Sequence, residues 1–198
     1  MRKATNKNWQ RVTAAAAALA LCAGVLTGCG ASSSTAAGST AASSAAASGV
    51  SSEEADEMAA KNVADLIDAI YVQERNENTD AQCEAAKAAW DALTDAQKEL
   101  VEGEEADPDY FGRDTGDASK DDARNQDNIG DNEILVVSFG TSFNDSRAAD
   151  IKGIEDAIQA AYPDWSVRRA FTAQIIINHV QARDGEKIDN MEQALERA

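Results

Sequence analysis

The chain has 198 residues, with 18 Lys and Arg against 35 Asp and Glu, which gives a formal net charge of −17 at pH 7. Nucleic-acid binding requires a basic surface, so this charge argues against nucleic acid as a partner. Of the three cysteines only Cys83 lies beyond residue 29, so no internal disulfide is expected after removal of the leader described next, and CxxC metal or redox motifs are absent.

Residues 1–29 are predicted to be an export signal. Four basic residues precede an uncharged apolar run over residues 12–26, which is too short for a membrane-spanning helix of about 20 residues. The run ends in Leu26-Thr27-Gly28-Cys29, which resembles a bacterial lipobox. This resemblance implies that Cys29 is lipidated and anchors an exported protein to the cell membrane. The alternative is an ordinary signal peptide followed by a coincidental cysteine.

Cleavage before Cys29 changes the charge and leaves a tether. The basic residues fall from 18 to 14 against 35 acidic ones, so the mature charge is −21. Electrostatic binding to an anionic membrane is therefore not expected, and the lipid alone would hold the protein there. Residues 30–51 are almost entirely Ala, Ser, Thr and Gly, a composition that buries too little to fold and predicts a flexible tether.

Residues 52–103 are predicted to form a small α-helical module. Apolar residues follow helical spacing, Ser51 or Ser52 suits the first helix start, and Thr94 suits the start of a third, short helix. The stretch around Ala89-Trp90-Asp91 resembles modules repeated in bacterial surface proteins, which implies a spacer or interaction element. For Cys83 and Trp90 we expect packing between helices, with a redox or ligand role as the alternative.

Residues 104–133 are rich in acidic residues and are predicted to be a solvated linker, or an arm that wraps the next domain. A calcium-binding EF-hand loop does not fit. Such a loop needs an oxygen donor at position 5 and Glu at position 12. Counted from Asn125, these positions are Ile129 and Val136.

Residues 134–198 show an α/β pattern. The apolar run Ile134–Phe139 predicts a strand of a parallel sheet that is covered on both faces, and Gly140 ends it. The next helix is expected to be capped by Asp145 or Ser146. A second strand is predicted over residues 165–171.

The remaining elements follow the second strand. Thr172 is expected to cap a helix that ends at the turn Arg183-Asp184-Gly185, and Asn190 to start another helix. Two parallel strands bury too little area for a stable sheet. The chain is therefore expected to be the front part of a longer protein.

A resemblance to a known family lies within this α/β segment. The run Leu135–Ser142 is similar to the opening of the anaerobic sirohydrochlorin cobaltochelatases, which are class II tetrapyrrole chelatases. Four further stretches match at the family's spacing: Arg169–Thr172, Ile175-Ile176, Arg183–Gly185 and Ile188-Asp189. The resemblance implies a bilobal α/β fold with a tetrapyrrole cleft. It also implies Co²⁺, with Fe²⁺ or Ni²⁺ as alternatives, as the substrate metal of anaerobic cobalamin synthesis, and no organic cofactor.

Candidate substrate contacts follow from the same stretches. Gly140 would permit close approach of the macrocycle, while Thr141, Ser142 and Thr172 would donate hydrogen bonds to its carboxylates. Arg147 is expected to form a cationic rim for this polyanion.

Arg168 or Arg169 is expected to join that rim. The alternative for these arginines is a surface ion pair, and the alternative for Gly140, Thr141, Ser142 and Thr172 is helix capping. The family's catalytic and metal-binding histidines are expected beyond residue 198, so none is assigned here, and residues 29–198 alone are not expected to insert cobalt. His179, the one histidine, is expected to be a packing or surface residue.

Two other functions stay under consideration. One is a tetrapyrrole- or metal-binding lipoprotein without catalysis, which would lack histidines at later strand ends. The other is an unrelated α/β enzyme that holds a phosphate at the Gly140 loop, although neither a Walker lysine nor GxGxxG follows the strand. Assembly into a homo-oligomer is left open.

Overall fold

The computed structural model describes residues 51–127 and 129–198. The chain divides into two units, residues 1–46 and 47–198, so every described residue belongs to the second unit. The predicted signal peptide, the lipidation residue Cys29 and all but the last residue of the predicted tether lie outside the described residues. Among the described helices, none combines the length and the apolar character needed to cross a bilayer.

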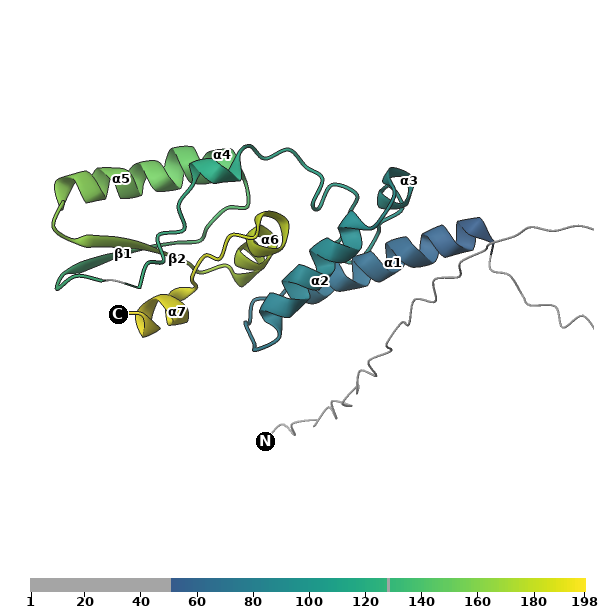
Figure 1. The fold of residues 1–198 in the computed structure, drawn as a ribbon, viewed down its shortest axis with the longest axis horizontal. Coiled ribbons are helices and arrows are strands. Elements are labelled where there is room, and N and C mark those ends of the chain that lie inside the picture. The colour runs from purple at the N-terminus through teal and green to yellow at the C-terminus, as the bar shows by residue number, and fades with distance from the viewer. Residues whose placement is uncertain (1–50, 128) are drawn as a thin grey trace, which may run out of the picture. The chain divides into compact units, whose positions relative to one another are not determined.

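The helical module contains the three predicted helices: α1 (Ser52–Ile70), α2 (Thr79–Asp91) and α3 (Asp95–Lys98) (Figure 1). Capping boxes begin α1 and α3, because the Ser51 and Thr94 side chains each accept the backbone N–H three residues later, and their own backbone N–H groups donate to the side chain of that residue. Cys83 and Trp90 are buried between helices, as expected for packing residues. Burial raises the pKa of the Cys83 thiol to about 11, so the thiolate form is disfavoured.

The acidic segment before the sheet is an arm that packs on the rest of the unit. The Asp68 carboxylate of α1 accepts the N–H groups of Glu104, Glu105 and Ala106 at 2.8, 2.9 and 3.0 Å. Tyr110 and Phe111 are buried against the module, and a 3₁₀ turn spans Ala118–Lys120. This segment, which we call the arm, therefore packs through its first part on the helical module that precedes it.

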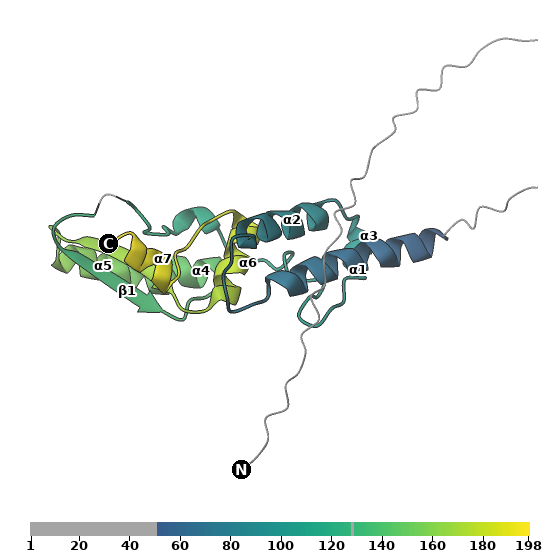
Figure 2. The same ribbon diagram turned by 90° about the horizontal axis from the view of Figure 1, so that it is seen from below.

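The α/β segment consists of two strands, four α-helices and one π-helical turn. In chain order these are β1 (Glu133–Ser138), α4 (Asn144–Ser146), a π-helical turn (Arg147–Ile151), α5 (Lys152–Ala161), β2 (Ser166–Phe171), α6 (Gln174–Asp184) and α7 (Met191–Glu196). The strands pair in parallel, from Glu133 opposite Ser166 to Ser138 opposite Phe171. In Figure 1, α5 lies above the strands and α7 below them, and Figure 2 shows the same elements turned by 90°.

Two expectations about this segment are confirmed and one is wrong. Gly185 ends α6 in the left-handed conformation, and Asn190 caps α7 through a capping box. In contrast, β1 is not covered on both faces by the described residues. Its side chains are mostly half-buried and Val137 is 43% exposed, because α5 and α7 pack mainly on β2 and not on β1. The buried strand is β2, where Val167, Ala170 and Phe171 are fully enclosed.

The predicted side-chain caps of two helices are also wrong, for a common reason. Phe143 and Ala173 occupy the cap positions of α4 and α6, and neither forms a side-chain cap bond. Partners distant in sequence accept the free N–H groups instead. Thr115 O of the arm accepts Asp145 N at 2.8 Å, and Gln73 Oε1 of the module accepts Gln174 N at 3.2 Å.

A chain of buried amides joins the module to the α/β segment. Asn190 Nδ2 donates to Gln174 Oε1 at 2.9 Å, and Gln174 Nε2 donates to Asn178 Oδ1 at 2.8 Å. Asn178 Nδ2 then donates to Ile70 O at the end of α1, also at 2.8 Å. Since Asn178 is fully buried, water cannot replace these bonds.

Replacing Asn178 with alanine is expected to lower the free energy of unfolding by about 3 kcal/mol, because Gln174 Nε2 and Ile70 O would remain buried without partners. Urea denaturation measures this change. The control is Asn62→Ala on the exposed surface of α1, which is expected to change stability by less than about 0.5 kcal/mol. Equal stability of the two variants would contradict the role given to the amide chain.

Candidate functional site

The candidate site lies where the carboxyl ends of β1 and β2 meet. In open parallel sheets ligands bind at this edge, because the loops that follow the strands converge there. The chain after β2 runs beside the end of β1, since Thr172 N donates to Ser138 O at 2.9 Å and Ala173 N donates to Phe139 O at 3.3 Å. Gly140, Thr141 and Ser142 follow β1, as the sequence predicted.

Gly140 has a structural reason to be glycine. Its φ is +96°, a left-handed conformation that other residues rarely adopt. A Cβ atom at this position would lie 2.4 Å from a ring carbon of Phe171, which is fully buried. The absence of a side chain at Gly140 therefore allows the Phe171 ring to pack against the backbone of Gly140. This contact holds the end of β1 against the end of β2.

The loop after Gly140 is fixed by hydrogen bonds to its backbone. Thr141 Oγ1 accepts Phe143 N at 3.2 Å. Ser142 O accepts from Arg183 at 2.7 Å and from Arg147 at 3.4 Å. Among the described residues, the Ser142 hydroxyl has no hydrogen-bond partner, so it is available to a ligand.

Two separate cavities border this edge of the sheet. The first, of about 230 Å³, is lined by Ser142 and by residues that include Tyr71, Tyr110, Phe143 and His179. The second, of about 190 Å³, is lined by Gln73, Phe171, Thr172, Gln174, Asn190, Met191 and Glu192. The structure therefore brings Ser142 and Thr172 to the same edge but into different cavities.

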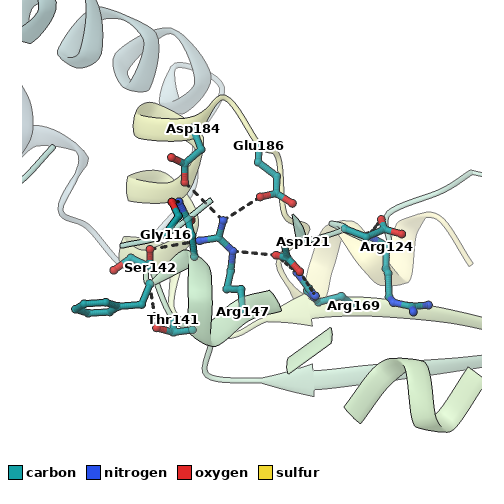
Figure 3. A network of polar contacts seen from close by, with 12 residues as sticks. Gly116, Asp121, Arg124, Thr141, Ser142, Arg147, Arg169, Asp184 and Glu186 are labelled. Carbon is teal, nitrogen blue, oxygen red and sulfur yellow. Dashed lines mark hydrogen bonds and ion pairs between the residues drawn. The ribbon is translucent and has the colours of Figure 1, made fainter. Parts of the chain in front are cut away.

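Arg147 lies in the protein interior, which corrects its predicted role as a contact at the ligand rim. Its side chain is fully buried and lines neither cavity. Figure 3 shows the guanidinium between Asp121 of the arm and the carboxylates of Asp184 and Glu186 at the end of α6. Arg147 Nε donates to Asp121 Oδ2 at 2.9 Å, and a second nitrogen donates to Glu186 Oε2 at 3.0 Å. A guanidinium enclosed in this way cannot also contact a macrocycle.

Arg169 extends the same network, so it does not form a rim either. It is fully buried, with one nitrogen 2.7 Å from Asp121 Oδ2 and another 2.8 Å from Glu155 Oε2. Burial opposes ionisation, but the hydrogen bonds and charge of Arg169 hold the pKa of Asp121 below its usual value. Burial raises the pKa of Glu186. The network thus balances buried charges of opposite sign, and it joins the arm to β2.

Arg168 points the other way from its neighbour. Its Nε donates to Glu133 Oε1 at 2.7 Å, and its side chain is fully buried. Adjacent strand residues face opposite sides of a sheet, so Arg168 and Arg169 together require an acidic partner on each face. That signal in the sequence could have predicted these buried ion pairs.

His179 is a packing residue in this arrangement. Its ring stacks on Tyr110, with centroids 4.3 Å apart and planes inclined by 17°, and meets the edge of Phe111. Burial, followed by the charge of Arg183, lowers the pKa of His179 to about 4, so the imidazole is neutral at pH 7. In residues 51–127 and 129–198, no three His, Cys, Asp or Glu side chains are arranged to hold a metal ion.

Comparison with known proteins concerns the α/β segment. The family model described as cobalt chelatase (CbiK) matches residues 132–198. A curated relative, the sirohydrochlorin cobaltochelatase of Salmonella typhimurium, is 44% identical over 64 residues, which are 32% of this chain and 24% of the relative. The match thus spans about a quarter of the relative's length. No solved structure matches the chain.

Proposed function

We propose that the protein is a metal chelatase that inserts Co²⁺ into a sirohydrochlorin-type tetrapyrrole, from the premise that residues 132–198 match the cobalt chelatase (CbiK) family model. The observation that carries the proposal is the family match over the segment that forms the edge of the sheet. Cobalt is a substrate of this reaction, and its product belongs to cobalamin biosynthesis.

The residues at the sheet edge support binding of the macrocycle. The Ser142 and Thr172 hydroxyls follow the two parallel strands and can donate to ring carboxylates. Chelation also needs a base for the pyrrole protons and ligands that deliver the metal. Neither of these two roles is assigned to a described residue.

Export and lipid anchoring form a second part of the proposal. It is supported by the apolar run before Cys29 and by the lipobox-like sequence Leu26–Cys29. Metabolic labelling with a radioactive fatty acid tests it, since the wild-type chain should be labelled and a Cys29→Ser variant should not. Equal labelling of both chains would refute lipidation at Cys29.

The activity is tested with the complete protein expressed from its gene, sirohydrochlorin and Co²⁺ under anaerobic conditions, since residues 29–198 alone are not expected to insert cobalt. Absorbance first measures sirohydrochlorin binding and then the spectral change on metal insertion. Ser142→Ala and Thr172→Val are each expected to weaken binding about fivefold, the effect of one lost hydrogen bond of about 1 kcal/mol. Asn62→Ala is the control and should bind as the wild type does.

Each result has a clear meaning. Binding with cobalt insertion supports a chelatase. Binding without insertion by the complete protein favours a tetrapyrrole-binding lipoprotein instead. Absence of sirohydrochlorin binding would overturn both.

A further inference from the structure

The helical module supplies a wall of the second cavity at the end of β2. Gln73 follows α1 and belongs to the part of the chain that the family model does not match. It nevertheless lines the same cavity as Thr172, together with Gln174 and Asn190. This cavity therefore combines residues of the module with residues of the family segment.

The orientation of the Gln73 amide is determined by its partner. Gln174 N is a backbone donor, so the atom that it contacts at 3.2 Å must be the carbonyl oxygen of the Gln73 side chain. The Gln73 amide nitrogen keeps both of its hydrogens, and it has no hydrogen-bond partner among the described residues. The hydrogen bond from Gln174 N of α6 thus holds the Gln73 side chain in place, and its amide N–H groups can donate to a ligand.

The amides on the opposite wall of the cavity are already hydrogen-bonded to one another. The Asn190 side-chain oxygen accepts Gln193 N at 2.9 Å, which directs its Nδ2 to Gln174. Gln174 in turn uses its Nε2 on Asn178, and both residues are buried. Asn190 Nδ2 and Gln174 Nε2 thus each use one N–H on a protein acceptor. Within residues 51–127 and 129–198, the Gln73 amide and the Thr172 hydroxyl are the side-chain donors lining this cavity that make no hydrogen bond as donors.

We propose that Gln73 is a ligand-binding residue of the tetrapyrrole site, where its amide N–H groups, with the Thr172 hydroxyl, hold a carboxylate side chain of the macrocycle. This inference rests on the proposed function. Two neutral donors suit an oxygen acceptor, whereas an amide N–H cannot ligate a metal ion. Glu192 is the one charged residue that lines the cavity. It is exposed, and its charge opposes a carboxylate ligand across water.

One substitution at Gln73 can test sirohydrochlorin recognition without disturbing the fold. Gln73→Glu retains a side-chain oxygen for Gln174 N, but it removes the donor and adds a negative charge. Gln126→Glu is the matched control, because Gln126 is exposed on the arm, lines neither cavity and makes the same change of charge. Glu192→Gln is the complementary variant, since it removes the opposing charge.

Sirohydrochlorin affinity is measured by absorbance titration of the full chain, with urea denaturation to compare stability. Gln73→Glu is expected to weaken binding at least about tenfold at unchanged denaturation midpoint, as expected for a lost hydrogen bond to a charged group. Gln126→Glu should match the wild type, and Glu192→Gln should bind more tightly. If the wild type binds sirohydrochlorin and Gln73→Glu binds it as tightly as Gln126→Glu does, the role of Gln73 is refuted. The proposed function is not affected by that result. Failure of the wild type to bind sirohydrochlorin would remove the proposed function, and this inference with it.

Discussion

An Arg169→Leu variant is expected to lose about 3–5 kcal/mol of unfolding free energy. The substitution leaves the carboxylates of Asp121 and Glu155 without their shared guanidinium, and all three side chains are fully buried. A loss of this size is a large part of the stability of an ordinary domain. Urea denaturation followed by circular dichroism measures it.

The control for this variant is Arg113→Leu on the arm. Arg113 is half exposed and its ion pair with Asp109 is 3.5 Å long, so its removal should cost less than about 1 kcal/mol. Similar losses in the two variants would show that the buried network contributes no more than a surface pair.

The pH dependence of the unfolding free energy of the wild type and of Arg169→Leu provides a second test. The pKa of Asp121 is lowered in the folded wild type, so its contribution is complete above the carboxylate's unfolded pKa of about 4 and is lost as pH falls through the folded value. In Arg169→Leu, Asp121 loses one guanidinium but keeps that of Arg147, so its folded pKa should rise relative to the wild type. The variant should therefore lose less stability than the wild type as the pH is lowered from about 5 to about 3. Equal losses of stability in the two proteins over this range would contradict the assignment.

Gly140→Ala is expected to cost about 2–4 kcal/mol. The new methyl group would overlap the Phe171 ring, and alanine at a φ of +96° is strained as well. Because this contact joins the ends of β1 and β2, we also expect weaker sirohydrochlorin binding. Thermal and urea denaturation measure the first effect, and absorbance titration the second.

Gly153→Ala in α5 is the matched control. A Cβ atom there meets nothing within 4 Å, and alanine favours a helix over glycine by about 0.5–1 kcal/mol. Gly153→Ala should therefore stabilise the protein slightly and leave binding unchanged. A Gly140→Ala variant that behaves in the same way would refute the packing role of Gly140.

Local patterns in the sequence were sufficient for most of the elements. The capping boxes at Ser51, Thr94 and Asn190 and the turn at Gly185 lie where the sequence predicted a helix end. The parallel pairing of the two strands was also expected. These features depend on contacts within a few residues, or on the short helical connection between two apolar runs, so a linear pattern contains them.

The roles of charged and polar side chains could not be derived in the same way. Arg147 was expected at a ligand rim, but Asp121 of the arm encloses it. Asp145 and Thr172 were expected to cap helices, but Thr115 and Gln73 accept the N–H groups instead. In each case the partner comes from the arm or the module, outside the segment that resembles a chelatase.

The sequence by itself determined the order of the elements, the similarity of residues 132–198 to the cobalt chelatase (CbiK) family and the loop Gly140–Ser142 at the end of the first strand. Only the tertiary structure decided which hydroxyls and amides border a cavity and which arginines are enclosed in ion pairs. The physical reason is that hydrogen-bonding and charged groups are satisfied by whichever partner the fold brings within about 3 Å. Asp121 meets Arg169 across 48 residues and Gln73 meets Gln174 across 101, and no local pattern specifies such pairs.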